Sequence, residues 1–359
     1  MTESARSSPS PDLIDVRPDE RFDEAAVAAW LRDRLPGADR PLSVRQFGGG
    51  HANLTYLLRF GSGEDAVEYV LRRPPLGPVP PGAHDMEREY RVLSRLYRGF
   101  PKAPRAYVFC GDESVIGAPF FVMERRHGVV VRGQVPEIFG GGRDPVANRK
   151  LSEVVMDVLA EFHAVDPASV GLGDLGRPEG FLERQVRGWA ARFERARIEE
   201  VPVAEEVCRW LLDELPQSPS PTLLHNDWRL DNMAVSPEDP GRCVAVYDWD
   251  MCTRGDPLAD LGTVLAVWHA PGEPAGASPM PTSAPGFMTR EEAARRYAER
   301  SGRDLSTLPY YIVFGTFKMA VVLQQIYYRY HRGQTKDERF AGMGAAARAL
   351  FELAARRRP

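Results

Sequence analysis

The chain has 359 residues, a length that suggests about two domains or lobes at roughly 150 residues each. Apolar residues make up 43% of the sequence and charged residues 27%, which is ordinary for a globular protein. The net charge of −4 does not provide the basic surface that nucleic-acid binding usually needs, so we expect no nucleic-acid partner. The four cysteines form no C-x-x-C pair, which indicates reduced thiols and argues against a disulfide framework or a zinc cluster.

The first twenty residues are rich in Ser, Pro and Asp, and this composition predicts a disordered tail over 1–20. They contain no apolar segment of the kind that marks a signal peptide. Together with the reduced cysteines, this favours a cytoplasmic protein.

Residues 21–126 have an α+β pattern and predict an N-terminal lobe. Apolar residues at helical spacing predict helices over 23–35 and 84–98. Apolar or alternating runs between turn residues predict strands of an antiparallel sheet over 42–47, 53–60, 66–72, 106–110 and 119–124.

Residues 127–359 predict a mainly helical C-terminal lobe that begins with a linker over 128–145. Helical periodicity covers 151–162, 179–197, 202–215, 257–269, 290–300, 308–331 and 336–356, and short extended runs lie at 222–225, 233–235 and 244–247. The apolar run 310–328 contains Lys318, Gln324 and Gln325, which favours a buried helix over a membrane span. We therefore expect no membrane partner.

Three polar residues follow or precede short apolar runs in the stretches LLHNDWRLDNMAV (223–235) and VAVYDWDMCTRGDPLADL (244–261). Asp227 lies in the loop after the first run, Asn232 precedes the second, and Asp248 ends the third. Phosphoryl transfer from a nucleotide needs one carboxylate near the acceptor hydroxyl, and an amide oxygen and a second carboxylate that hold Mg²⁺ on the phosphates. Each residue alone is common in turns, but the ordered set favours phosphotransfer.

The motifs H-N-D-W-R-L-D-N and Y-D-W-D…G-D-P-L-A-D-L resemble those of the aminoglycoside phosphotransferase family. Within it they are most similar to the branch that includes kinase domains fused to acyl-CoA dehydrogenases. The resemblance covers about residues 25–350 and implies a bilobal protein-kinase-like α+β fold. It implies a small antiparallel-sheet lobe that binds nucleotide and a mainly helical lobe with the catalytic loop and acceptor site. The implied activity is a small-molecule kinase that uses ATP or GTP as phosphoryl donor and Mg²⁺ as cofactor.

The resemblance also implies roles for individual residues. Asp227 is the expected catalytic base, and Asn232 and Asp248 are the expected Mg²⁺ ligands. Asp250 is a further candidate metal ligand, because it shares a strand face with Asp248 if that strand continues.

Two other positions of the loop have expected structural roles. Asp260 matches the family aspartate that braces the catalytic-loop backbone from a following helix, and His225 matches a scaffold residue. Asn226 departs from the Gly that the family usually has, although Asn tolerates the left-handed backbone region better than most residues.

The resemblance places nucleotide in the N-terminal lobe. The glycine-rich turn between the first two strands would cover the phosphates, although a plain hairpin turn is the commoner reading of such a segment. The segment 121–124 would join the lobes and read the adenine through its backbone. The candidate nucleotide-binding residues of these segments are Gly48, Gly49, Gly50, His51, Asn53, Met123 and Glu124.

The kinase-like fold expects a lysine on the third strand, but the sequence has no lysine before Lys102. Arg72 is the candidate replacement because its guanidinium also binds phosphate, and Arg73 on the other strand face is the alternative. Glu89 shares a helix face with apolar residues and is the expected partner of the cation. A surface pair with a neighbouring arginine is the alternative for Glu89.

Three functions remain open from the sequence. The first is an active kinase with a nucleotide and a small-molecule acceptor as its partners, and the second is an inactive kinase-fold protein that binds nucleotide. The third, least favoured, is a phosphatase with Asp248 and Asp250 as an aspartyl nucleophile pair. The chain has no clear acidic run, which favours a hydroxy acid or hydroxyacyl-CoA as acceptor over an aminoglycoside.

Overall fold

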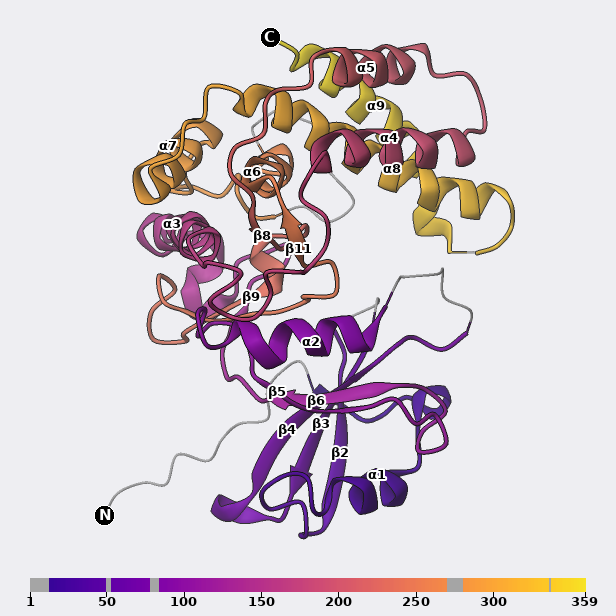
Figure 1. Cartoon of the computed structure of the whole chain (residues 1–359), viewed down its shortest axis with the longest axis vertical. Coiled ribbons are helices and arrows are strands. Elements are labelled where there is room, and N and C mark those ends of the chain that lie inside the picture. Colours follow the sequence, from indigo (N-terminus) through magenta and orange to yellow (C-terminus); the bar gives the residue numbers. More distant parts are fainter. Residues whose placement is uncertain (1–12, 50–52, 78–83, 270–279, 336) are drawn as a thin grey trace. The chain divides into compact units, whose positions relative to one another are not determined.

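The computed structural model describes residues 13–49, 53–77, 84–269, 280–335 and 337–359. The chain divides into two compact units, one ending at Arg126 and the other beginning at His127 (Figure 1). The first contains an antiparallel sheet and the second is mainly helical, which confirms the predicted α+β class.

Antiparallel strands form the sheet of the N-terminal unit. Within the described residues the strand order is β1 (Leu13–Ile14), β2 (Leu42–Phe47), β3 (Leu54–Phe60), β4 (Val67–Arg73), β6 (Phe120–Glu124) and β5 (Ala106–Cys110). The alternating and apolar runs predicted β2 to β6 to within a residue at each end. The short 3₁₀ helices η1 (Pro18–Glu20) and η2 (Gly63–Asp65) connect parts of this unit.

The predicted disordered tail over 1–20 is wrong for residues 13–20. Leu13 and Ile14 pair with the end of β2, and the backbone N–H of Arg17 donates to the Gln46 side chain at 3.0 Å. A two-residue apolar pair inside a polar segment is too short to show in composition, so only the strand pairing reveals it.

Helices α1 (Glu24–Leu31) and α2 (Met86–Leu96) pack against the sheet of this unit. Asp23 and Asp85 cap their N-termini by accepting backbone N–H groups. One sheet face forms a hydrophobic core with α1 that includes Val27, Leu31, Tyr56, Leu58, Phe60, Tyr69, Leu71, Phe120 and Val122. Side chains alternate along a strand, so the residues between these, including Arg72, point to the opposite face.

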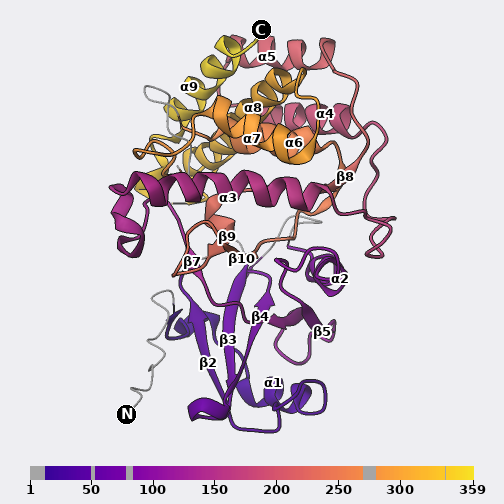
Figure 2. The same ribbon diagram turned by 90° about the vertical axis from the view of Figure 1, so that its left-hand side faces the viewer.

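The C-terminal unit is built from helices of 10 to 24 residues. They are α3 (Pro145–His163), α4 (Phe181–Arg195), α5 (Pro202–Asp213), α6 (Pro257–Ala266), α7 (Arg290–Ser301), α8 (Leu308–His331) and α9 (Met343–Arg356). Figure 2 shows α3 along its length with α7 beside it, where Arg296 Nε donates to Asp157 Oδ1 at 2.7 Å. Helical periodicity predicted all of these helices, but α3 begins six residues before the predicted 151 and α9 seven residues after the predicted 336, where the 3₁₀ helix η5 (Glu338–Phe340) precedes it.

Short strands and 3₁₀ helices position the loops of this unit. The strands are β7 (Val129–Val130), β8 (Thr222–Leu224), β9 (Met233–Val235), β10 (Cys243–Val246) and β11 (Thr253–Gly255), and the 3₁₀ helices are η3 (Glu137–Gly142), η4 (Leu230–Asn232) and η5 (Glu338–Phe340). β7 pairs with β9, so the predicted linker over 128–145 begins with a strand of the C-terminal unit. No helix in the described part of the chain has the length and hydropathy needed to cross a membrane.

Helix α8 packs against α4, α6 and α9. The contact with α6 is closest where two glycines meet, because a Cβ on Gly315 would lie 2.7 Å from the carbonyl oxygen of Gly262. The backbones of α6 and α8 therefore pack directly against each other at this point.

We expect Gly315→Ala to lower the free energy of unfolding by about 1–3 kcal/mol, because overpacking outweighs the better helix propensity of Ala. Gly188→Ala, inside helix α4, is the matched control, since no heavy atom of the described residues outside that helix's backbone lies within 4 Å of its added Cβ. Urea denaturation of both variants measures the difference. Equal stabilities would contradict the close α6–α8 contact.

Candidate active site

The predicted catalytic loop leaves the buried strand β8 at His225. β8 pairs with β11, so the start of the loop is fixed by a two-stranded ladder. Asn226 has a φ of 67°, in the left-handed region that favours Gly, and its side-chain Nδ2 donates to the Met251 carbonyl at 2.9 Å. Asn at the usual Gly position therefore adopts the left-handed backbone and adds a hydrogen bond.

Asp260 on α6 holds the loop backbone in place. Its carboxylate accepts the backbone N–H groups of His225 at 2.6 Å and of Asn226 at 2.7 Å. The residue is only 1% exposed, so these charge-assisted bonds lie away from water. This is the bracing role that the family resemblance implied.

A buried histidine completes the brace. His163 Nε2 lies 3.4 Å from Asp260 Oδ2, and His163 Nδ1 lies 2.7 Å from the Tyr297 hydroxyl. Burial lowers the pKa of His163, so we assign a neutral ring that donates to Asp260 and accepts from Tyr297. Burial acts to raise the pKa of Asp260, but hydrogen bonds from His163 and the loop backbone outweigh it and lower that pKa.

His225 connects the catalytic loop to the segment after β10. Its Nε2 lies 2.9 Å from the Tyr247 carbonyl, and the backbone N–H of Asp227 donates to its Nδ1 at 3.3 Å. The ring is fully buried and contacts Trp228 and Trp249, with centroids 5.5 and 4.7 Å away. His225 therefore holds two parts of the loop region together, the scaffold role expected from the sequence.

Asp227 and Asn232 lie side by side. Asn232 Nδ2 donates to the Asp227 carbonyl and to Asp227 Oδ2, both at 2.9 Å. Both bonds use the amide nitrogen, so the amide oxygen of Asn232 points away from Asp227. Among the described residues no hydrogen bond to that oxygen is recorded. An oriented amide oxygen of this kind fits a Mg²⁺ ligand.

Asp248 follows β10 with a φ of 67°, an uncommon backbone for Asp. β10 ends at Val246, so the strand does not continue through Asp248 to Asp250. The shared-face argument for Asp250 as a metal ligand is therefore wrong, because the backbone turns at Asp248. Trp249 between them is fully buried, and its Nε1 donates to the Val246 carbonyl at 2.7 Å.

The donor set suits Mg²⁺ better than zinc. Across the described residues, no group of three or more His, Cys, Asp or Glu side chains is placed to hold a metal ion. Mg²⁺ is commonly bound by one or two carboxylates together with substrate phosphates, so Asn232 and Asp248 fit it without a full protein cage.

The N-terminal unit brings Arg72 and Glu89 together. Arg72 Nε lies 3.1 Å from Glu89 Oε2, and the side chains are 9% and 0% exposed. Arg73 points to the other face, where it donates to the Ile116 carbonyl at 3.1 Å. Arg72 is therefore the cation that pairs with the α2 glutamate, and Arg73 is bound elsewhere.

The other predicted nucleotide-binding residues lie around the sheet of this unit. The carbonyl of Gly48 accepts from Arg17 at 3.4 Å, and Asn53 is buried with its Oδ1 2.8 Å from His84 Nδ1. Met123 is buried opposite Val70 in the ladder, and Glu124 pairs with Arg126 at 3.0 Å. Gly49 follows Gly48 in a bend, whereas Gly50 and His51 lie outside the described residues.

The sequence reasoning missed Lys318 as a residue of this region. Its Nζ donates to the Asn226 carbonyl at 2.9 Å, so α8 contacts the catalytic loop directly. A single lysine inside the apolar run 310–328 was the available signal. It was used only to argue against a membrane span.

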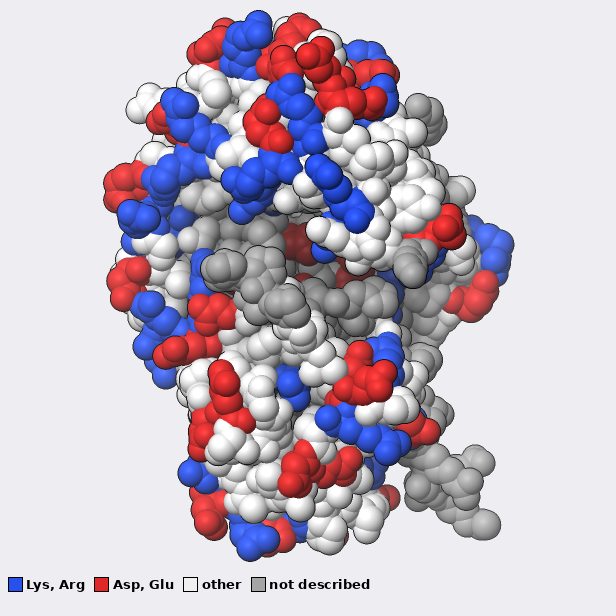
Figure 3. All heavy atoms as spheres, turned by 90° about the vertical axis from the view of Figure 1, so that its right-hand side faces the viewer, with Lys and Arg blue, Asp and Glu red and all other residues white. Residues whose placement is uncertain are grey.

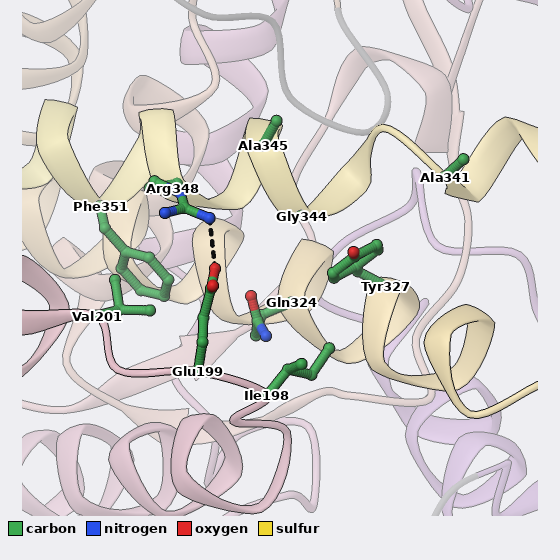
Figure 4. A pocket seen from close by; sticks show the side chains of 10 residues that line it. All are labelled: Ile198, Glu199, Val201, Gln324, Tyr327, Ala341, Gly344, Ala345, Arg348 and Phe351. Atoms are coloured by element: carbon green, nitrogen blue, oxygen red, sulfur yellow. Dashed lines mark hydrogen bonds and ion pairs between the residues drawn. The ribbon is translucent and has the colours of Figure 1, made fainter.

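A separate pocket of about 240 Å³ lies among α8, α9 and the segment before α5 (Figure 4). Glu199 and Arg348 form an ion pair across it. Tyr327 lines the pocket and follows Lys318 by nine residues, which places the two on opposite faces of α8. None of the predicted site residues lines this pocket.

We expect Asp260→Asn to lower the free energy of unfolding by about 2–3 kcal/mol at pH 7, because charged hydrogen bonds to the loop are lost. The pKa of Asp260 is lowered in the fold, so its stabilisation is present above 3.8 and disappears as pH falls through the folded value. Urea denaturation at pH 7 and at a series of pH values below 3.8 measures this. The exposed Asp213→Asn is the control, and equal effects would contradict the brace.

The comparisons with known proteins agree with this geometry. The model of the phosphotransferase enzyme family (APH) matches residues 43–305. Acyl-CoA dehydrogenase family member 11 of Gallus gallus is 33% identical over 344 residues, which cover 91% of this chain and 42% of that protein. The Homo sapiens protein of the same name is 32% identical over 337 residues, with the same two coverages. The chain therefore spans about two fifths of the length of these relatives.

Solved structures give the fold. A Ralstonia eutropha protein assigned as an aminoglycoside phosphotransferase matches with a TM-score of 0.79 and 31% identity, over 94% of this chain and 98% of that chain. Choline kinase of Cryptosporidium parvum has a TM-score of 0.61 at 11% identity, over 93% and 95%, and shares the fold alone. The chain belongs to the phosphotransferase enzyme family and has its kinase-like fold.

Proposed function

We propose that the chain is an active small-molecule kinase that transfers the γ-phosphoryl group of ATP or GTP to a hydroxyl group, with Asp227 as the base. Membership of the family makes it a phosphotransferase that acts on hydroxyl groups. The identity of the donor nucleotide, the identity of the acceptor and the roles of individual residues go beyond family membership and are what we propose. The observation that supports it most is the oriented pair Asp227 and Asn232 at the end of a braced loop.

The two carboxylate oxygens of Asp227 have different proposed roles, one in holding the side chain in place and the other in accepting a proton. Oδ2 accepts from Asn232, while the structure records no hydrogen bond to Oδ1 from the residues it describes. Oδ1 is therefore suited to accept the proton of an acceptor hydroxyl as that oxygen attacks phosphorus. The hydrogen bond from Asn232 Nδ2 to Oδ2 restrains the carboxylate, and the backbone N–H of Asp227 is held by His225.

Asn232 and Asp248 are the proposed ligands of Mg²⁺, and Asp250 remains a further candidate ligand. The ion would neutralise charge on the phosphates. Arg72 is the proposed cation for the nucleotide phosphates, oriented by its ion pair with Glu89. Gly48, Gly49, Gly50, His51, Asn53, Met123 and Glu124 remain proposed nucleotide contacts.

We propose a hydroxy acid or hydroxyacyl-CoA as acceptor and an aminoglycoside as the less favoured one. The relatives at 32–33% identity are acyl-CoA dehydrogenase family members, which favours an acyl compound as acceptor. The sequence has a net charge of −4 but no run of acidic residues, which argues against a cationic aminoglycoside. We also propose a cytoplasmic location, because the four cysteines are interpreted as reduced thiols.

An inactive nucleotide-binding protein is the second candidate, because the expected lysine is absent. Two observations oppose it. Asn226 keeps the left-handed backbone that the usual Gly would allow, and Arg72 takes a buried ion pair with Glu89. Neither departure from the family pattern therefore disrupts the site.

We expect Asp227→Asn to lower kcat by at least about 100-fold, because the hydroxyl loses its proton acceptor. ADP release over a panel of hydroxy acids, hydroxyacyl-CoA esters and aminoglycosides measures the rate. Asp239→Asn removes a carboxylate from the exposed β9–β10 loop and should keep the wild-type rate. Full activity of Asp227→Asn would contradict the assigned role.

We expect Arg72→Gln combined with Glu89→Gln to weaken binding of Mg²⁺·ATP or Mg²⁺·GTP by at least about tenfold, or 1.4 kcal/mol. The double change avoids leaving one buried charge unpaired, which would destabilise the fold by itself. Arg72→Lys keeps the charge and should bind more tightly than the double variant. Isothermal titration calorimetry measures the affinities, and wild-type binding by the double variant would exclude Arg72 as the phosphate cation.

A further inference from the structure

Two cations share one aromatic ring beside the catalytic loop. Trp189 on α4 is buried, the Arg192 Cζ lies 4.5 Å from its ring centroid, and the Lys318 Nζ lies 5.6 Å from the same centroid. Lys318 also donates to the carbonyl of Asn226, the residue before Asp227. The pair therefore lies next to the proposed base, on α4 and α8 of the same unit.

The charges of these two cations are only partly balanced by carboxylates. In the ranges that the structure describes, no ion pair of Arg192 or Lys318 is recorded, although Arg187 on the same helix pairs with Glu183 at 2.8 Å. Burial lowers the pKa of Arg192, with a further contribution from Arg195. Burial also lowers the pKa of Lys318, although the carboxylates of Asp227 and Asp260 act to raise it, and Arg192 adds to the lowering. Arg192 has no carboxylate among the causes that shift its pKa, and it adds a second positive charge beside Lys318, so this pair is suited to bind an anion.

A glycine on α4 leaves room for such an anion. Gly188 lies one helical turn before Arg192, and a Cβ added there would meet no heavy atom of the described residues within 4 Å, apart from the backbone of its own helix. Its φ is not positive, so the backbone does not require glycine. A helix-interior glycine costs about 1 kcal/mol relative to Ala, and packing does not explain it here. The open space beside Arg192 is thus available to a ligand.

The arginines on and near α4 differ in how they are bound. Figure 3 shows many Lys and Arg side chains, interspersed with Asp and Glu, over one face of the C-terminal unit. Most of the arginines on and near α4 are engaged, because Arg184 donates to the Glu179 and Arg177 carbonyls and Arg197 pairs with Glu194 and Glu205. Arg192 differs from these neighbours because, among the described residues, it has no recorded hydrogen bond or ion pair and instead lies over the ring of Trp189.

We propose that Arg192 and Lys318, with the open space at Gly188, form a subsite for an oxyanion of the acceptor. The proposal rests on the kinase function proposed above. Lys318 contacts the residue adjacent to Asp227, so the oxyanion lies only a few bonds from the hydroxyl that is phosphorylated. The geometry favours a compact hydroxy compound with its own carboxylate or phosphate over a thioester whose nearest phosphates are far from the hydroxyl.

The test compares three small probes that differ in charge. They are 3-hydroxybutyrate with a carboxylate, glycerol 3-phosphate with a phosphate, and the neutral 3-hydroxybutyramide. Isothermal titration calorimetry measures their binding to the full chain without nucleotide, and ADP release measures turnover. Wild-type protein should bind at least one of the two anions at least about tenfold more tightly than the amide, and the anion preferred identifies the oxyanion.

Two variants and a control test the residues. Arg192→Gln keeps a planar group over Trp189 without the charge, and should weaken binding of the preferred anion about tenfold while leaving the amide unchanged. Gly188→Leu should weaken all acceptor binding by filling the open space, without lowering the melting temperature, because Leu favours helix more than Gly. The control Arg187→Gln removes an exposed charge one turn away and should bind like wild type.

The outcomes separate this proposal from the kinase function. The subsite is overturned if the wild-type protein binds the anions no more tightly than the amide. It is also overturned if the wild-type protein binds neither anion. Equal behaviour of Arg192→Gln and Arg187→Gln also overturns it. Mg²⁺·ATP binding is measured in parallel. If the kinase function fails, nucleotide binding or turnover is absent, whereas binding of the anions still tests the subsite by itself.

Discussion

The Asp260 carboxylate fixes the backbone at the start of the catalytic loop. It accepts the N–H groups of His225 and Asn226 from within α6, and buried His163 supports it from α3. An uncompensated carboxylate at 1% exposure would be strongly unfavourable, so the loop and the carboxylate stabilise each other. Because α6 packs directly against α8 through Gly262 and Gly315, the same arrangement also places α8 beside the loop.

This constraint explains how the chain departs from its family without disrupting the loop. A residue with a Cβ is strained at a φ of 67°, but Asn226 gains a hydrogen bond to Met251 through its side chain and another to Lys318 through its carbonyl. We propose that Arg72, which is buried against Glu89, takes the place of the missing lysine of the N-terminal unit. In both cases a neighbouring polar group accommodates the substitution.

Local patterns predicted most of the elements and the ordered motifs, but not the contacts that depend on distant residues. Alternation and apolar runs gave β2 to β6, and the inward face of α2 gave Glu89 as the partner of Arg72. The strand at Leu13–Ile14 was missed because it is defined only by pairing with β2. The turn at Asp248 and the approach of Lys318 to the loop are tertiary features, and neither has a periodic signal in the sequence.

The central claim, a Mg²⁺-dependent nucleotide site completed by Asp248, is tested most directly by thermal denaturation with ATP and GTP, each with and without Mg²⁺. A nucleotide at about 100 times its Kd stabilises the fold by about 2.7 kcal/mol, a readily measured shift. We expect Mg²⁺ to increase this shift in the wild type and in Asp239→Asn, and to have little effect in Asp248→Asn. No shift with either nucleotide, or an unchanged Mg²⁺ effect in Asp248→Asn, would contradict the account.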